Sequence, residues 1–238
     1  MKVAVITGAA QGIGRRTAEV LAQAGYALAL MDMRSCEATL AAAQQSEADA
    51  KEFRGDISDE GVVIRAVAAV TKRWGGVDVL VNNAGIMKLS NIAAVDDLTF
   101  DSLIAVNLKG TFNGMREAAS RLREGGRIVN FSTSVIGLRL ETYGIYAATK
   151  SAVETLTAIF AKELRGRAIT VNAVAPGPTA TDLFLVGKPQ ELIDRMAKMN
   201  PLERLGKPED IAAVVSFLAG PDGAWVNGQV LRANGGMV

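Results

Sequence analysis

The sequence predicts an α/β protein with one doubly wound parallel sheet of about seven strands and helices on both faces. Short apolar runs alternate with longer helix-like segments from end to end. Many of these runs are too apolar for strands with one solvent-exposed face. Such runs are typical of a parallel sheet covered by helices on both sides. No linker, repeat or low-complexity tract interrupts the alternation, so residues 1–238 are expected to form a single domain.

The strands are expected where apolar runs end in turn-forming residues. They lie in KVAVITG (2–8), YALALMD (26–32), AKEFRGD (50–56), DVLVNNAG (78–85), GRIVNFST (126–133), AITVNAVAPG (168–177) and GQVLRANGG (228–236).

The helices are expected between these runs, and several stop at a glycine, as helix C-termini prefer. They lie in residues 13–25, 35–45, 60–75, 98–125, 143–164 and 208–220. The one irregular region is 178–207, with prolines and mixed polarity. After a strand's carboxyl end, such a segment can cover a ligand crevice, so we expect it to cover the substrate.

The composition excludes several classes of protein. The chain is 49% hydrophobic and carries a net charge of +1, which suggests neither a nucleic-acid nor an acidic-membrane partner. No apolar run approaches the roughly 18 residues that a membrane span needs. The N-terminus lacks the cleavage pattern of a signal peptide, and the single Cys36 cannot form an internal disulfide. A cytoplasmic location is therefore expected.

The absence of histidine restricts the possible chemistry further. It excludes a Ser-His-Asp triad, a Cys-His pair and every zinc site that contains histidine. One cysteine also excludes a thiolate cluster, so no metal site is predicted. Any acid–base catalyst must be a carboxylate, a lysine or a tyrosine.

A glycine-rich turn follows the first strand, in TGAAQGIG (Thr7–Gly14). Glycine lets the backbone approach a pyrophosphate, and the following helix N-terminus offers free N–H groups. The spacing is neither G-x-G-x-x-G nor that of a P-loop. A tight turn that binds nothing is the alternative, but the position at the first strand–helix junction favours a dinucleotide.

Acidic residues end the next two strands. Asp32 stands where a carboxylate can accept hydrogen bonds from ribose hydroxyls, and capping the following helix is a compatible role. Asp56 ends the third strand, where a place near the adenine and a turn-forming role are about equally supported.

The stretch YGIYAATK (143–150) pairs a tyrosine with a lysine. Tyr146 and Lys150 are spaced i, i+4, which places both side chains on one face of a helix. Tyr143 has no basic residue four positions on, since Ala147 stands there. The pairing therefore favours Tyr146 for proton transfer.

Together these residues resemble the short-chain dehydrogenase/reductase family, over essentially the whole chain. TGAAQGIG is similar to its TGxxxGxG loop, Asn82–Gly85 to NNAG, Tyr146–Lys150 to YxxxK, and Pro176-Gly177 with Thr181 to its PG segment. Within the family the chain is most similar to 3-oxoacyl-carrier-protein reductase-like and glucose dehydrogenase-like members. The resemblance implies a Rossmann-type fold, a nicotinamide cofactor and a homotetramer.

The resemblance also implies site residues. The catalytic set would be Asn107, Ser134, Tyr146 and Lys150. The cofactor would be bound by Gly8, Gln11, Gly12, Ile13, Gly14, Asp32, Asp56, Ile57, Asn83, Ala84, Gly85, Tyr146, Lys150, Pro176, Gly177, Thr179 and Thr181. Ser132 and Ser134 are both candidates for the serine. The family pattern of serine, two small or apolar residues and glycine fits Ser134–Gly137 better, and Ser132 would pack in the strand.

These residues suggest the interconversion of a secondary alcohol and a ketone. The cofactor would exchange the hydride and Tyr146 the proton, with Ser134 holding the substrate oxygen and Asn107 anchoring a water beside Lys150. A free tyrosine has a pKa of roughly 10. A lysine cation ~4 Å away at an effective dielectric of ~20 contributes ~4 kcal/mol, which bounds the lowering at about three units. Desolvation opposes it.

Two alternatives stay open. One is a dinucleotide-sensing regulator with the same fold and no turnover. The other is a 3-oxoacyl-carrier-protein reductase of fatty-acid synthesis, for which Arg121, Arg123, Arg127, Arg165 and Arg167 would supply a basic docking patch. The substrate pocket is expected to be largely apolar. Its candidate lining residues are Met87, Leu138, Leu140, Tyr143, Leu183 and Phe184.

NAD is expected to be favoured over NADP, because Asp32 would lie against the extra phosphate. Gln11 agrees, since relatives that use NADP often place a base just before Gly12. Arg15, Arg16 and Arg34 are the counter-evidence, because a guanidinium turned toward the phosphate would offset the repulsion.

Overall fold

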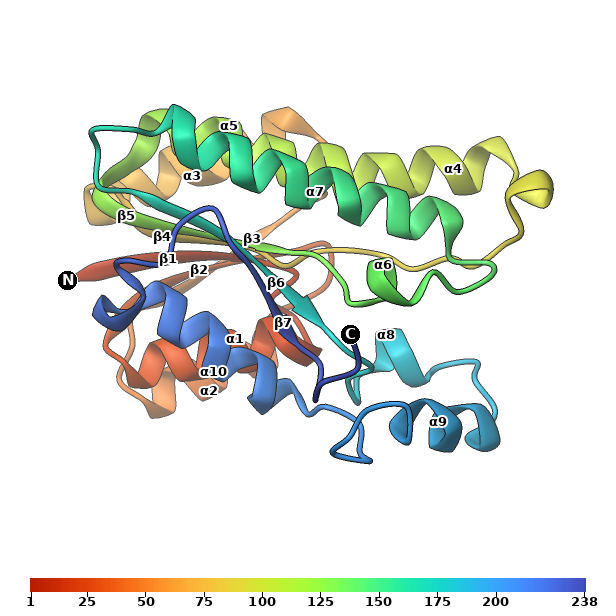
Figure 1. Ribbon diagram of the computed structural model, residues 1–238. Helices are drawn as coiled ribbons and strands as arrows, with labels where there is room; N and C mark the ends of the chain where they lie inside the picture. Colours follow the sequence, from red (N-terminus) through yellow and green to blue (C-terminus); the bar gives the residue numbers. More distant parts are fainter.

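A single parallel sheet organises the chain. The computed structural model describes residues 1–238 and shows seven strands in the order β3-β2-β1-β4-β5-β6-β7, all paired in parallel (Figure 1). The predicted fold class is confirmed. The strands are β1 (Lys2–Thr7), β2 (Tyr26–Asp32), β3 (Ala50–Arg54), β4 (Val77–Asn82), β5 (Leu122–Phe131), β6 (Thr170–Pro176) and β7 (Val230–Ala233).

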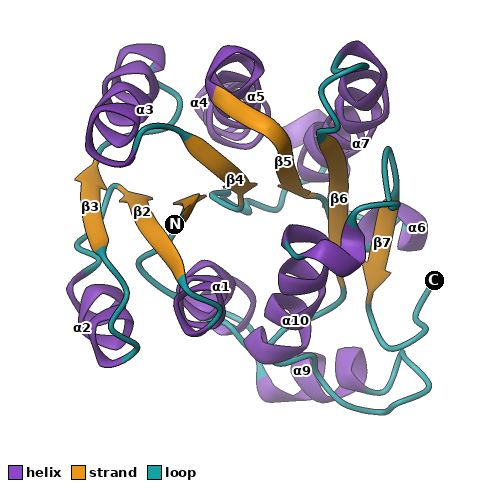
Figure 2. Cartoon of the chain, turned by 90° about the vertical axis from the view of Figure 1, so that its left-hand side faces the viewer, coloured by secondary structure: helices purple, strands orange, loops and turns teal.

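Helices cover both faces of this sheet. Figure 2 shows α3, α5 and α7 on one face and α1, α2 and α10 on the other. The helices are α1 (Gly12–Gln23), α2 (Glu37–Gln45), α3 (Glu60–Trp74), α4 (Asp97–Leu103), α5 (Gly110–Arg121), α6 (Val135–Leu138), α7 (Gly144–Glu163), α8 (Asp182–Leu185), α9 (Gln190–Ala197) and α10 (Pro208–Ala219), with short turns η1 (Ile92–Ala94), η2 (Ile104–Lys109) and η3 (Pro221–Gly223).

The core is divided by the sheet into two apolar layers. Ile6, Leu28 and Val81 point to the α1/α10 side, whereas Val5, Ala29 and Leu80 point to the α3/α5 side. Successive residues of a strand face opposite sides, so both faces of the central strands are buried. This double burial is why the strands read as continuous apolar runs in the sequence. No helix is both long enough and apolar enough to cross a membrane.

The helix predicted over 98–125 is not continuous. It consists of α4, the π-helical turn η2 and α5, and the chain enters β5 at Leu122. The expected end of the helix was therefore wrong by four residues. A π turn widens the helix locally and is frequent at functional sites. Here it contains Asn107, which is fully buried and forms side-chain bonds across to the loop after β4.

The strands place the candidate residues at one edge. The glycine turn follows β1, Asp32 ends β2, Asn83–Gly85 follow β4 and Pro176 ends β6. Carboxyl ends of parallel strands meet at the same edge of a sheet, and ligands bind there. In Figure 1 this edge faces α6, α8 and α9.

Candidate active site

The glycine-rich turn lines a cavity of about 440 Å³ at the end of the central strands. Gly8 and Gly12 have φ of +68° and +55°, which side chains rarely adopt. A Cβ on Gly14 would lie 2.0 Å from the Gly8 carbonyl oxygen. The turn can close this tightly only with glycine at these positions.

The beginning of α1 offers unpaired donors to this cavity. Its N-cap, Gln11, forms no side-chain capping bond, and no acidic residue lies in the first turn. Free N–H groups and the positive end of the helix dipole suit a pyrophosphate. The cavity is lined further by Asn83, Ala84 and Gly85. The residues present therefore fit a dinucleotide.

Asp32 lies at the mouth of this cavity and is only 9% exposed. Its Oδ2 accepts from Ala10 N at 3.0 Å and its Oδ1 from Arg34 N at 2.9 Å. The Arg34 guanidinium donates to Gln11 Oε1 at 2.6 Å, and its Nε is 3.8 Å from Asp32 Oδ1. The carboxylate thus faces the expected ribose end, but an arginine lies beside it.

Asp56 and Ile57 also line the cavity. Asp56 Oδ1 accepts from Ser58 N at 2.8 Å, so this carboxylate forms the turn before α3. Of the two roles considered for Asp56, the turn role is therefore present. A place in the lining is compatible with it.

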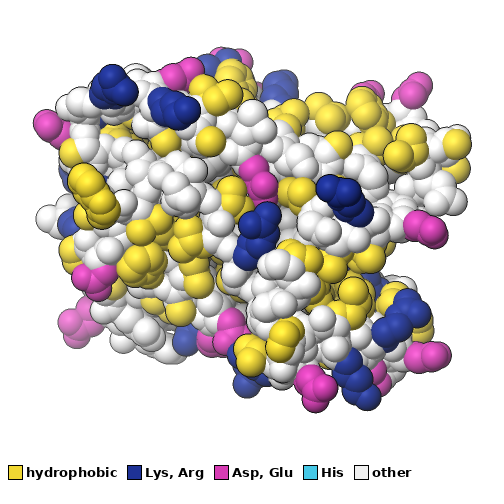
Figure 3. All heavy atoms as spheres, in the orientation of Figure 1, with side chains coloured by type: hydrophobic (Ala, Val, Ile, Leu, Met, Phe, Trp, Pro, Cys, Tyr) yellow, Lys and Arg dark blue, Asp and Glu magenta, His cyan; other side chains and the backbone are white.

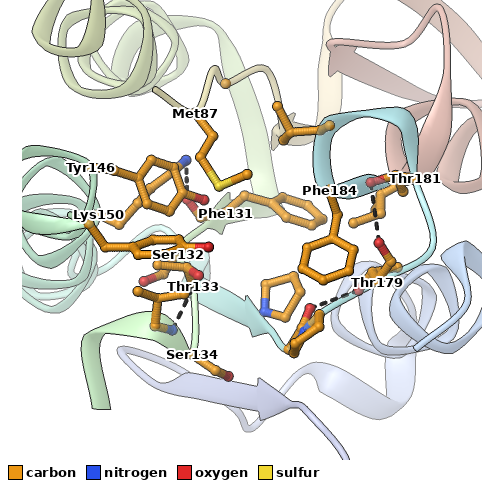
Figure 4. A pocket seen from close by; sticks show the side chains of 18 of the residues that line it. Met87, Phe131, Ser132, Thr133, Ser134, Tyr146, Lys150, Thr179, Thr181 and Phe184 are labelled. Atoms are coloured by element: carbon orange, nitrogen blue, oxygen red, sulfur yellow. Dashed lines mark hydrogen bonds between the residues drawn. The ribbon is translucent and has the colours of Figure 1, made fainter. Parts of the chain in front are cut away.

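Tyr146 and Lys150 lie together in a second cavity of about 120 Å³. They are 8% and 4% exposed. The two cavities meet, because Ile13, Asn83, Gly85, Thr181 and Leu183 line both. A ligand in the first cavity would therefore reach the tyrosine. Figure 4 shows this region, with Lys150 Nζ donating to the carbonyl oxygen of Phe131 at 2.9 Å.

The expected lowering of the Tyr146 pKa by Lys150 is not present in this structure. Burial raises the pKa of Tyr146 to about 12, opposed by a hydrogen bond with Thr133. Burial also lowers the pKa of Lys150 to about 8. Desolvation disfavours both charged forms, and the ammonium group is directed to Phe131 O. At neutral pH the phenol is therefore a proton donor.

Three consecutive residues with hydroxyl groups follow β5, and their hydroxyl protons have different hydrogen-bond acceptors. Ser132 Oγ donates to Glu154 Oε1 at 2.7 Å, and Ser134 Oγ donates to Ala175 O at 2.8 Å. Thr133 Oγ1 accepts from Val135 N at 3.3 Å, and its hydroxyl meets the Tyr146 phenol rather than a carbonyl or carboxylate oxygen. Carbonyl and carboxylate oxygens only accept, so Thr133 alone of the three can donate to a substrate oxygen.

Ser134 lines the same cavity as Tyr146 and Lys150, but its proton is donated away from the expected substrate position. Besides its bond to Ala175 O, it accepts from Asn234 Nδ2 at 2.9 Å, and Figure 4 shows it apart from Tyr146 and Lys150. The structure brings Thr133 to the phenol instead. The sequence pattern of a serine, two residues and a glycine indicated Ser134. It gave no sign that the preceding residue, Thr133, is the hydroxyl beside the phenol.

Asn107 is held by backbone and side-chain bonds. Its Oδ1 accepts from Ile86 N at 2.8 Å, and its Nδ2 donates to Ile86 O at 2.9 Å and Thr149 Oγ1 at 3.3 Å. A Cβ on Gly85 would lie 3.2 Å from Asn107 Oδ1 and 3.4 Å from Lys150 Nζ. Asn107 and Lys150 therefore approach the same point, beside Gly85.

The segment 178–207 contributes to the second cavity from its far side. Thr179, Thr181, Leu183, Phe184 and Met196 line it, and Pro176 and Gly177 lead into the segment. Of the apolar lining residues expected, Met87, Leu138, Tyr143, Leu183 and Phe184 are present, whereas Leu140 is not. Met196 lies within the segment expected to cover the substrate, and three lining residues were missed, namely Phe131, Thr133 and Met237. No local pattern marks them, because distant elements place them there.

Known proteins resemble this chain over nearly its whole length. A family model described as "Enoyl-(Acyl carrier protein) reductase" matches residues 8–238. The chain is 39% identical to a short-chain type dehydrogenase/reductase of Picea abies over 250 residues, covering 100% of this chain and 92% of the relative. It is 38% identical to an NADPH-dependent aldehyde reductase-like chloroplastic protein of Arabidopsis thaliana over 254 residues, covering 100% and 94%.

The fold comparison agrees as well. A short chain dehydrogenase from Burkholderia cenocepacia, solved in complex with NADP, superposes with a TM-score of 0.94 at 33% identity. The match covers 99% of this chain and 97% of that one. The chain therefore belongs to the short-chain dehydrogenase/reductase family, a family of nicotinamide-dependent oxidoreductases.

Proposed function

We propose that this protein interconverts a secondary alcohol and a ketone, with Tyr146 exchanging the proton at oxygen. The observation that carries the proposal is the buried, neutral phenol of Tyr146 in an apolar cavity that opens into the dinucleotide cavity. The nicotinamide, when bound, accepts or delivers the hydride. A neutral phenol can donate its proton to the oxygen of a carbonyl compound that is being reduced.

Each residue would have a defined task in this reaction. Gly8–Gly14 and the start of α1 would hold the pyrophosphate, with Asn83–Gly85 beside it. Pro176, Gly177, Thr179 and Thr181 would lie beside the nicotinamide. Lys150 would hold the nicotinamide ribose. Asn107 would anchor a water that connects Lys150 to solvent.

The proposal is tested by carbonyl-dependent oxidation of NADH and NADPH over sugars, diols, sterols and cyclic compounds, assayed in both directions. Turnover would exclude the alternative of a dinucleotide-sensing regulator. Tight cofactor binding without turnover on any of these classes would support the regulator instead.

Three of the five arginines proposed for the docking patch of a carrier-protein reductase already have partners within the chain. Arg123 pairs with Asp78 at 2.7 Å, and Arg127 and Arg167 donate to backbone carbonyls around the start of β5. That end of β5 is opposite the cavity (Figure 1). On the face in Figure 3, basic and acidic side chains are interspersed. We therefore favour a free small-molecule substrate.

Thr133 is the hydroxyl that we assign to the substrate oxygen, in place of Ser134. We expect Thr133→Val to lower kcat at least tenfold, because removing a donor to a developing charge costs about 1.5–3 kcal/mol. Thr133→Ser should restore most of it. Steady-state kinetics would check this, and a larger loss in Ser134→Ala than in Thr133→Val would return the role to Ser134.

We propose that NAD is favoured over NADP through Asp32. The NADP-bound neighbour and the NADPH-dependent relative weigh against this proposal, and Arg34 is the residue that would offset the repulsion. We expect kcat/KM for NAD to exceed that for NADP at least tenfold, which needs only ~1.4 kcal/mol. Asp32→Ser should reduce that ratio. A wild-type preference for NADP, or an unmoved ratio in Asp32→Ser, would exclude Asp32 as the discriminator.

We also propose a homotetramer. Phe112 on α5 and Ile159 on α7 are 43% and 48% exposed, and outward apolar residues on long helices suit a partner helix. Light scattering at micromolar concentration should report four chains, and a monomer mass would contradict this. A cytoplasmic location is supported by the free, buried thiol of Cys36.

A further inference from the structure

Residues 234–238, the closing segment, join the loop after β5 to the site. Asn234 Nδ2 donates to Ser134 Oγ at 2.9 Å. The orientation of this amide is set by its other end, because Asn234 Oδ1 accepts from Gly236 N at 2.9 Å and from Met237 N at 3.2 Å. The same side chain therefore holds Ser134 and turns the backbone that carries Met237.

Close packing fixes the closing segment on three sides. A Cβ on Gly137 would lie 3.0 Å from Val238, and one on Gly177 would lie 2.9 Å from Asn234. On the third side, a Cβ on Gly235 would lie 2.6 Å from Asn200 Oδ1, and Gly235 has φ of +68°. The segment therefore touches the loop after β5, the loop after β6 and the end of the segment 178–207.

The segment contributes an apolar wall to the substrate cavity. Met237 lines it together with Met87, Met196 and Phe184, which come from three other parts of the chain. Lys150 is the single charged lining residue, and its ammonium group donates to Phe131 O. Methionine adapts to differently shaped apolar groups, and a ~150 Å³ apolar cavity is known to hold benzene. The cavity measures about 120 Å³, and the nicotinamide would lie on the side lined by Gly177 and Thr181, so the space left for the substrate suits only a compact group.

We propose that the closing segment, held by the Asn234–Ser134 hydrogen bond, is the specificity-determining wall of this cavity, and that the substrate is a compact, uncharged carbonyl compound with one apolar group of about ring size. This inference rests on the proposed function. It gives Ser134 a positioning role, because Ser134 acts through the segment that it anchors. The one charged lining residue, Lys150, is assigned to the nicotinamide ribose, so a charged carbonyl compound would find no counter-ion on the Met237 side of the cavity.

The test is the ratio of kcat/KM values for three probes, namely cyclohexanone, the fused-ring ketone decalone and the anion pyruvate. We expect the wild type to prefer cyclohexanone at least tenfold over each of the others. Met237→Ala removes side-chain volume from the wall, and Asn234→Ala releases the segment. Both should raise the decalone-to-cyclohexanone ratio at least fivefold. Met199→Ala is the matched control, because Met199 is 41% exposed and outside the cavity.

Two results would overturn the inference while carbonyl reduction stands. One is a wild type that uses pyruvate better than cyclohexanone. The other is a Met237→Ala variant whose ratio equals that of Met199→Ala. Because Met237→Ala removes only a cavity-facing side chain, it decides the question even if Asn234→Ala does not fold. Absence of turnover with every carbonyl compound would refute the proposed function as well.

Discussion

Tyr146→Phe is expected to lower kcat at least a hundredfold while the Kd for the cofactor changes by no more than a few fold. General acid catalysis contributes roughly 10²–10⁴-fold, and this substitution removes the proton that is transferred. The ring would still pack, because Tyr146 is buried against Leu103 and Tyr143. Steady-state kinetics together with cofactor titration would separate the loss of chemistry from a loss of binding.

Tyr143→Phe is the matched control, since Tyr143 lines the same cavity and is equally exposed at 8%. It should change KM more than kcat, because its hydroxyl has no lysine one turn away. Retention of more than a few per cent of wild-type kcat in Tyr146→Phe would refute the assignment. A comparable collapse in Tyr143→Phe would move the acid–base role to that residue.

Lys150→Met is expected to abolish turnover and to stabilise the ligand-free protein. The pKa of Lys150 falls from 10.5 to about 8 because burial disfavours its cation. At ~1.4 kcal/mol per unit, methionine should raise the free energy of unfolding by about 1–3 kcal/mol at pH 7, less the lost bond to Phe131 O. Urea denaturation at pH 7 would measure the gain, and a variant less stable than the wild type would contradict it.

The pH dependence of that gain has a definite sign. Between about pH 8 and 10.5 the unfolded chain holds the Lys150 proton and the folded protein does not. The unfolding free energy contributed by this residue therefore rises with pH across that window. The cost of burying the cation is fully present below pH 8, so the advantage of the methionine variant should shrink from pH 8 toward 10. Denaturation of both proteins at pH 7, 8, 9 and 10 would follow the difference.

The sequence predicted the pairing of Tyr146 with Lys150 but not their pKa values, and this difference has a physical reason. The spacing of Tyr146 and Lys150 is local, so helix geometry alone predicts that they share a face. Their pKa values depend on everything that surrounds them, and burial outweighs the attraction expected between them. The interruption of the predicted helix at η2 likewise depends on residues far apart in the sequence, because Asn107 in this turn bonds to Ile86.

The sequence alone determined the features that depend only on residues close together along the chain. Double burial made each central strand an apolar run, the turn geometry required Gly8, Gly12 and Gly14, and the helix spacing paired Tyr146 with Lys150. Only the tertiary structure decided which of three adjacent hydroxyls donates to no carbonyl or carboxylate, since Glu154, Ala175 and Asn234 come from other elements. Hydrogen-bond partners far apart in sequence leave no local pattern, and for that reason Thr133 and Met237 emerged only from the fold.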